Sequence, residues 1–275
     1  MNIFNVILIQ PLANGLMLFY RLLGGNMGLA IIGFSLALRM VLNPLTKPYM
    51  QSMKKMKELE PLLTKLKSKH AKDPKKLAEA QSSLYKEKGV NPAGGCLPYI
   101  LQIVVLIALF NVFTRALAAG PESLSKFNEL LYVPLKLAAT ETLNTHFLYL
   151  DITKPDIFRL PGIPFPIPGP LLFISAILQL VASMMMAPVV KVEEKLAKKT
   201  KTQTDDIQAS MQKSMMYTFP LFTLIFGVSF PSGLALYWML FSLWQVIQQY
   251  QTSGWGGMMP IISKLGHFSK KMVKS

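Results

Sequence analysis

One permanently charged side chain stands inside an apolar run of this sequence. Residues 28–45 read GLAIIGFSLALRMVLNPL, and Arg39 is the only ionisable side chain among them. A central arginine in a membrane-spanning helix costs about 3 kcal/mol on insertion scales, so the charge has to be hydrated or paired. Its chemistry is that of a fixed cation, which can bind an anionic group or hold water.

The sequence favours water over an ion pair for Arg39. None of the apolar segments predicted below contains Asp or Glu. Reaching the membrane surface is also difficult, because Arg39 precedes Lys47 by eight residues, a helical rise of about 12 Å. Helical side chains lean toward the amino end, which here is the opposite direction. A hydrated arginine is the remaining prediction.

Neutral polar side chains accompany Arg39 in the apolar segments. Singly, each is typical of a helix–helix hydrogen bond. Together with an unpaired cation they predict a hydrophilic groove that is open to the cytoplasm and accepts acidic or polar peptide segments. These residues are Ser35, Gln102, Asn111, Ser175, Gln179, Ser183, Thr218, Thr223, Ser242 and Gln245.

The usual signatures of catalysis and of metal binding are missing from the sequence. The apolar segments hold no carboxylate pair, and neither an HExxH motif nor a glycine-rich phosphate loop occurs. The single cysteine, Cys96, excludes a cysteine cluster, and the three histidines lie far apart outside the apolar segments. We therefore expect a protein that is not an enzyme and needs neither metal nor cofactor.

The elements that position Arg39 follow from composition. Of the 275 residues 51% are hydrophobic and 16% are charged, and the mean hydropathy is +0.36. This composition favours an all-α polytopic membrane protein. Five spans of about 20 residues are predicted. They are residues 27–46, 97–117, 168–189, 212–230 and 232–250.

The first 26 residues are predicted to form an interfacial helix on the outer side. The apolar stretch 3–23 is interrupted by Gln10, Pro11, Asn14 and Gly15, and it lacks the basic leader of a signal peptide. A sixth span over 3–23 is the alternative, and it would move only the amino terminus to the other side.

The distribution of lysines predicts the orientation of the spans. Residues 47–90 carry 12 Lys and 5 acids, whereas residues 118–167 carry 4 basic and 5 acidic side chains. Residues 191–213, which include the loop 191–211, carry 6 Lys and 4 acids, and the tail 251–275 carries 4 Lys and no acid. The lysine-rich segments are thus predicted to be cytoplasmic. The net charge of +15 then reflects topology, which disfavours direct nucleic-acid binding.

The first cytoplasmic segment, 47–90, is predicted to be an antiparallel helical hairpin. An apolar stripe recurs every three or four residues, and Pro61 should kink or break the first arm. Asp73 is the expected N-cap of the second arm, before Pro74. Besides joining the arms, Met50, Met53 and Met56 are predicted to contact a client or partner. The bend NPAGGCLP, residues 91–98, leads into the next span.

Four ordered motifs in this chain resemble the YidC/Oxa/Alb membrane protein insertases. They cover about residues 5–250 and are GNMGLAIIGFSLALRMVLNPLTKP (25–48), NPAGGCLPYILQ (91–102), FLYLDITKPD (147–156) and FPSGLALYW (230–238). The sequence departs from the family pattern at Val104, where many members have proline, and at Phe241 and Ser242, where Ser-Asn is common. We expect neither the extra first span and large outer domain of the proteobacterial form nor a lipoprotein signal.

The resemblance implies a five-span core around a groove that is open to cytoplasm and lipid and closed outside. It places Arg39 in the groove and Gln179 and Trp238 along it, with the third and fifth spans forming an apolar slide. It also implies a multi-pass protein of the cell membrane with its amino terminus outside and its carboxyl terminus in the cytoplasm.

The predicted function is insertion of nascent hydrophobic segments into the bilayer, alone or with the Sec translocon. The predicted partners are nascent membrane proteins, the ribosome, the Sec translocon, the signal recognition particle receptor and the lipid bilayer. The alternative is a small transporter or channel for an anionic solute that uses Arg39 as its binding charge. A third possibility is an assembly factor that holds translocon subunits together.

Overall fold

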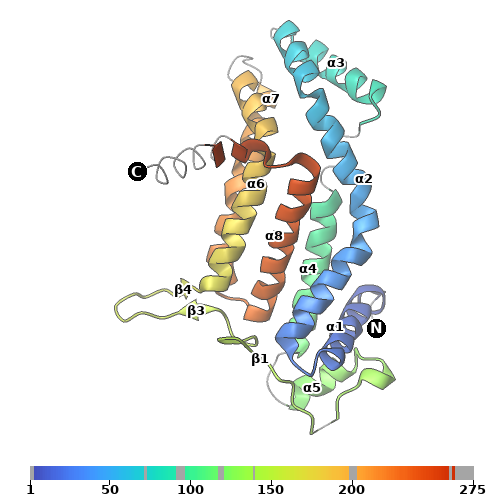
Figure 1. Cartoon of the computed structure of the whole chain (residues 1–275), viewed down its shortest axis with the longest axis vertical. Coiled ribbons are helices and arrows are strands. Elements are labelled where there is room, and N and C mark those ends of the chain that lie inside the picture. Colours follow the sequence, from blue (N-terminus) through green and yellow to red (C-terminus); the bar gives the residue numbers. More distant parts are fainter. Residues whose placement is uncertain are drawn as a thin grey trace, which may run out of the picture. The chain divides into compact units, whose positions relative to one another are not determined.

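The computed structural model describes residues 3–70, 73–90, 97–116, 121–138, 140–197, 203–259 and 262–263. The chain forms two compact units, each built from separate stretches of sequence (Figure 1). The first unit comprises Met1–Pro44, Leu97–Ala176 and Phe222–Ser242. The second comprises Leu45–Cys96, Ile177–Leu221 and Leu243–Ser275.

The first unit starts with an amino-terminal helix that has one buried face. A π-helical turn, η1 (Asn5–Ile9), leads into α1 (Gln10–Leu22). The buried face includes Leu12, Ala13, Leu16, Met17 and Tyr20. Gly24 and Gly25, both at positive φ, then turn the chain into α2 (Met27–Lys69).

The polar interruption of this apolar stretch has a structural cause. The buried Asn14 donates from Nδ2 to the Leu130 carbonyl (2.9 Å), and its Oδ1 accepts from the Tyr132 N–H (2.7 Å). At Gly15 a Cβ would lie 2.6 Å from the ring of Phe34, so the close approach of α1 and α2 requires glycine there. Whether this helix lies at a membrane interface stays a prediction.

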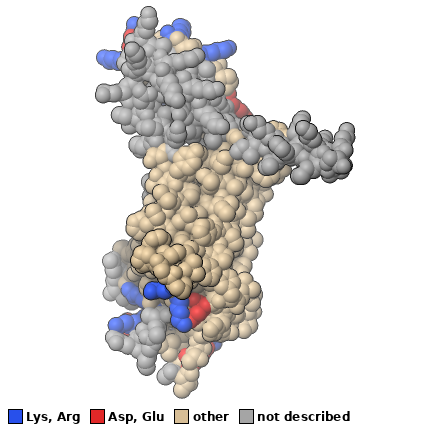
Figure 2. Space-filling model, turned by 90° about the vertical axis from the view of Figure 1, so that its left-hand side faces the viewer, with Lys and Arg blue, Asp and Glu red and all other residues tan. Residues whose placement is uncertain are grey.

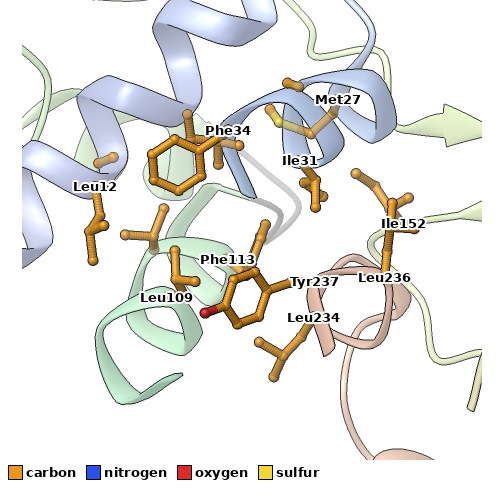
Figure 3. Close-up of a cluster of buried hydrophobic side chains, with 14 of the residues drawn as sticks. Leu12, Met27, Ile31, Phe34, Leu109, Phe113, Ile152, Leu234, Leu236 and Tyr237 are labelled. Carbon is orange, nitrogen blue, oxygen red and sulfur yellow. The ribbon is translucent and has the colours of Figure 1, made fainter. Parts of the chain in front are cut away.

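The core of the first unit is one apolar cluster, to which several helices and the segment between α4 and α6 contribute. Figure 3 shows side chains from α1, α2, α4 (Leu97–Ala116), α8 (Ser232–Ser253) and the segment around Ile152 meeting there. Phe113 and Tyr237 are among its largest buried members. Burial on this scale is the main contribution to the stability of the unit.

The described chain is mostly helical, as predicted, but the segment between α4 and α6 (Pro170–Ala197) also contains strands that the sequence did not predict. It holds α5 (Pro121–Asn128), the 3₁₀ turn η3 (Val133–Leu135) and four strands: β1 (His146–Phe147), β2 (Leu150–Asp151), β3 (Ile157–Phe158) and β4 (Ile167–Pro168). β1 pairs antiparallel with β2, and β3 with β4. Two-residue strands are too short to leave an alternating apolar pattern in the sequence.

The predicted boundary between the first span and the cytoplasmic hairpin is not a helix end. α2 runs without interruption over Met27–Lys69, through Pro44, Pro48 and Pro61. A proline removes a single main-chain hydrogen bond, and the turns on either side can keep the helix intact. A break at Pro61 is therefore wrong, whereas the alternative, a kink there, stays a prediction; the first arm of the hairpin is a continuation of α2.

In the second unit, the turn after α2 agrees with the sequence. Asp73 caps α3 (Pro74–Glu87), because its Oδ1 accepts from the Lys76 N–H at 3.1 Å. Leu59 of α2 and Leu77 of α3 are buried, as expected for two arms that pack on each other. The side chains of Met50, Met53 and Met56 lie outside the described residues, so their role stays a prediction.

The remaining long helices are α7 (Gln203–Gly227) and α8, followed by the short turn η4 (Gly256–Met258). By length and composition, one stretch among the described residues, Met27–Pro44, could cross a membrane. Three shorter apolar helices are Leu101–Ala116, Pro170–Met185 and Met216–Gly227. The five-span arrangement stays a prediction.

Candidate functional site

Arg39 lies on α2, within the apolar stretch Met27–Pro44, and it is half-buried. Its Nη2 donates to Oε1 of Gln102 on α4 at 3.1 Å. On the other side, its Cζ lies 4.0 Å from the centre of the Phe241 ring on α8, a cation–π contact. The guanidinium is thus held between a neutral amide and an aromatic face.

Gln102 connects Arg39 to the core of the first unit. Its Nε2 donates to the hydroxyl oxygen of Tyr237 at 3.4 Å. Tyr237 is 2% exposed and packs in the apolar cluster. Its hydroxyl therefore holds the Gln102 amide in position on the side away from Arg39. We call Arg39, Gln102, Tyr237 and Phe241 the arginine cluster; all four belong to the first unit.

Sequence reasoning selected two members of the arginine cluster and missed two. Tyr237 and Phe241 are four residues apart on α8, a spacing that places both on one helix face. That spacing was the available signal, and Phe241 had been noted only as a departure from the family pattern. Among the described residues no carboxylate forms an ion pair with Arg39.

Two other predicted groove residues of the first unit are packed rather than open. Ser35 is buried and its hydroxyl donates to the Ile31 carbonyl of its own helix. Trp238 is 7% exposed, with ring centres 6.4 Å from Phe222 and 6.0 Å from Phe230. A groove role for these two side chains stays a prediction.

Gln179 is buried on the part of α6 that belongs to the second unit. Its predicted place beside the groove stays a prediction. Several polar residues of the apolar helices donate to the carbonyl four residues earlier, which satisfies one donor of each within its own helix. These are Asn111, Ser175 and Ser242.

A second charged cluster in the first unit surrounds Asp151. Its carboxylate accepts hydrogen bonds from Thr153 Oγ1 (2.8 Å) and Thr145 Oγ1 (3.2 Å) and pairs with Lys154 Nζ (2.9 Å). Although burial alone raises the pKa of Asp151, the hydrogen bonds from Lys154, Thr153 and Thr145 outweigh it and hold the pKa well below its usual range. We call these four residues the aspartate cluster.

The aspartate cluster binds the start of α8. The N–H of Ser232 donates to the Lys154 carbonyl (2.8 Å), and the N–H of Gly233 donates to the Ile152 carbonyl (3.0 Å). The Ser232 hydroxyl also donates to the Asp151 carbonyl at 3.1 Å. The first N–H groups of a helix lack partners within it. The motifs LDITKP and FPSG are thus two halves of one helix cap.

The described residues contain no group of three or more His, Cys, Asp or Glu side chains that could hold a metal ion. What the site offers is a cation in an apolar helix, held by neutral groups. Apolar helices around such a charge define a helical membrane protein.

The chain belongs to the 60Kd inner membrane protein family, whose sequence model matches residues 18–255. It is 34% identical over 226 residues to the membrane protein insertase YidC of Chlorobium phaeovibrioides, covering 82% of this chain and 33% of that protein. It is 32% identical over 226 residues to the membrane protein insertase YidC of Fusobacterium nucleatum, covering 82% of this chain and 85% of that protein. The chain therefore spans about a third of the Chlorobium relative and most of the Fusobacterium one.

Proposed function

We propose that this protein is a membrane protein insertase that moves nascent hydrophobic segments from the cytoplasm into the bilayer. Membership of the family and relatives that carry the insertase name support this proposal. The protein acts as a path and a chaperone rather than as an enzyme.

The observation that carries the proposal is the neutral surroundings of Arg39. Within the part of the chain that the structure describes, the Gln102 amide and the Phe241 ring contact the guanidinium and orient it without cancelling its charge. A cation in low dielectric that lacks a counterion attracts negative charge and water strongly. Arg39 would therefore receive the acidic or polar flank of a client and shorten its apolar path across the membrane.

The client's apolar segment would leave sideways into lipid between the third and fifth spans, on α6 and α8. Exposed apolar side chains on each helix support this path: Phe173 and Ile174 on α6, and Leu243 and Ile247 on α8. The driving force is the client's own transfer from water, about 0.8 kcal/mol per CH₂ group.

The membrane arrangement in this proposal is five spans with a cytoplasmic carboxyl terminus and the amino terminus outside. The lysine-rich hairpin, residues 47–90, consists of the carboxyl-terminal part of α2 and of α3. It would bind the ribosome or the nascent chain, and Met50, Met53 and Met56 would contribute to this contact. The Sec translocon and the signal recognition particle receptor would be further partners for larger clients. The surplus of lysine over acid in 47–90 supports this side assignment.

The test is insertion of a short single-span client with an acidic flank into liposomes that contain only this protein. We expect Arg39→Ala to lower the insertion rate about tenfold, equivalent to roughly 1.4 kcal/mol, and Arg39→Lys to lower it less. Arg21→Ala is the matched control, because Arg21 donates to the Lys136 carbonyl on an exposed surface. Equal rates for wild type and Arg39→Ala would refute the role of Arg39. Anion flux without client insertion would favour the transporter instead.

A further inference from the structure

The β3–β4 hairpin, residues 157–168, has a surface unlike that of a loop in water. Its sequence is IFRLPGIPFPIP, in which Arg159 is the only polar side chain. Phe158 and Leu160 are each 51% exposed, and Phe165 is 65% exposed. Loops at a water-exposed surface are rich in polar residues, and clustered exposed apolar side chains mark an interaction surface.

The base of the hairpin is fixed to the start of α6. Asp156, 4% exposed, accepts the Leu171 N–H on Oδ2 at 2.8 Å, and its carbonyl accepts the Gly169 N–H at 2.8 Å. A Cβ at Gly169 would overlap this carboxylate, so glycine at this position leaves room for Asp156 to cap the start of α6. The Tyr149 hydroxyl also reaches Asp156, at 3.4 Å. These hydrogen bonds fix the base from which the exposed tip projects.

The backbone of the hairpin is adapted to scarce water. Four of its twelve residues are prolines, at 161, 164, 166 and 168, and a proline has no N–H that needs an acceptor. β3 pairs with β4 at Ile157↔Pro168 and Phe158↔Ile167, which accounts for further main-chain groups. Fewer unpaired main-chain groups lower the cost of entering an apolar phase.

The position of the hairpin points to lipid. Figure 1 shows it projecting sideways from the start of α6, whose first turns expose Phe173 and Ile174. In Figure 2, which shows the face that carries the hairpin, the surface directly above it is largely free of Lys, Arg, Asp and Glu, and charged side chains gather just below it. The exposed apolar surface thus continues from a helix that enters the membrane in the proposed arrangement.

We propose that the 157–168 hairpin is a membrane anchor whose tip is inserted into the outer leaflet beside α6. Phe158, Leu160, Ile163 and Phe165 lie at the level of the headgroups and the first acyl carbons, where aromatic rings are favoured. Arg159 reaches back to lipid phosphates, which fits a hairpin with one cation and no acid. The inference rests on the proposed membrane arrangement.

The test measures the depth of the tip in vesicles of phosphatidylcholine and phosphatidylglycerol, without client. Cys96→Ser removes the only native cysteine, and a nitroxide is then attached at Phe165→Cys. Thr140→Cys is the matched control, because Thr140 is exposed in the same unit but has a polar side chain. We expect the label at 165 to be relaxed more by oxygen than by a water-soluble nickel chelate, and the label at 140 to show the reverse order.

Two outcomes would overturn the anchor. Nickel access at 165 equal to that at 140 would place the tip in water, and spin–spin broadening at 165 would show that a second copy covers it. A second variant, Phe158→Ser with Leu160→Ser, removes apolar side chains that are exposed, so folding is retained; we expect it to raise nickel access at 165 several-fold. Depth is read without client, so a failure of client insertion leaves this result independent.

Discussion

Arg39 and Asp151 are two charges of the same unit that the protein treats in opposite ways. Asp151 has a cationic partner, Lys154, and two hydroxyl donors, so its charge is compensated within the loop. Arg39 contacts an amide and an aromatic ring, which fix its direction, and none of the described carboxylates compensates its charge. The difference separates a charge that maintains the fold from one that is available to a ligand.

The largest expected effect comes from making Arg39 resemble Asp151. Gln102→Glu places a carboxylate where the amide oxygen now lies 3.1 Å from the guanidinium, so the cation gains a permanent counterion. We expect client insertion in liposomes to fall about tenfold or more. Gln102→Met is the control of similar volume; it removes the hydrogen bond but adds no charge, and should cost less activity. Wild-type insertion by Gln102→Glu would contradict the distinction between the two charges.

The reverse change removes the compensated charge. Asp151→Ala deletes an acceptor shared by Thr145, Thr153 and Lys154 and loosens the cap of α8. We expect a loss of about 1–3 kcal/mol in the free energy of unfolding, measured by thermal unfolding in detergent. The control is Glu129→Ala, which removes an exposed carboxylate from the segment between α4 and α6. Equal stability of the two variants would show that the aspartate cluster is dispensable.

The pH dependence of this stability has a defined sign. Because the folded-state pKa of Asp151 is lowered, its ionised carboxylate stabilises the fold at every pH above its unfolded pKa of about 3.9. The stability difference between wild type and Asp151→Asn should stay constant between about pH 5 and 8. It should narrow as the pH falls below about 4, because the carboxyl then takes up a proton in the unfolded state but stays ionised in the folded state until its lower pKa is reached. If the difference in unfolding free energy between wild type and Asp151→Asn already narrows near neutral pH, another titrating group must be responsible.

The smallest effect is expected at the base of the hairpin. Burial, and then the charge of Asp156, raise the pKa of Tyr149, so its phenol is a neutral donor at physiological pH. The hydroxyl contacts Asp156 at 3.4 Å, a long hydrogen bond. Tyr149→Phe should therefore cost only about 0.5 kcal/mol in unfolding free energy. A loss as large as that of Asp151→Ala would show that the phenol is an essential part of the α6 cap.

The sequence predicted those parts of the fold that depend on local pattern. Asp73 and Pro74 predict the start of a helix, and α3 begins at Pro74 with Asp73 as its N-cap. The uninterrupted α2 was missed, because the end of the apolar run at residue 46 and the proline at 61 suggest boundaries that the helix passes through. The strands of the 146–168 region were missed although their partners lie close in sequence, because strands of two residues are too short to leave an alternating apolar pattern.

The candidate site was predicted as residues but not as contacts. The charge of Arg39 stands out in an apolar run, and Gln102 belongs to the same set of polar residues. That Phe241 covers the guanidinium depends on the rotation of α8, which the sequence alone leaves undefined. The rotation is fixed in part by Ser232 and Gly233, whose partners lie in the Asp151 loop.

The cap of α8 also bears on the order in which this protein is made. The Ser232 hydroxyl and its acceptor, the Asp151 carbonyl, are 81 residues apart in sequence. The ribosome synthesises this loop before α8. During synthesis the carbonyls of Asp151, Ile152 and Lys154 therefore lack the donors that Ser232 and Gly233 later supply. The arginine cluster also needs α8, because Phe241 and Tyr237 lie on it. The first unit can therefore complete its folding only after α8 has been synthesised.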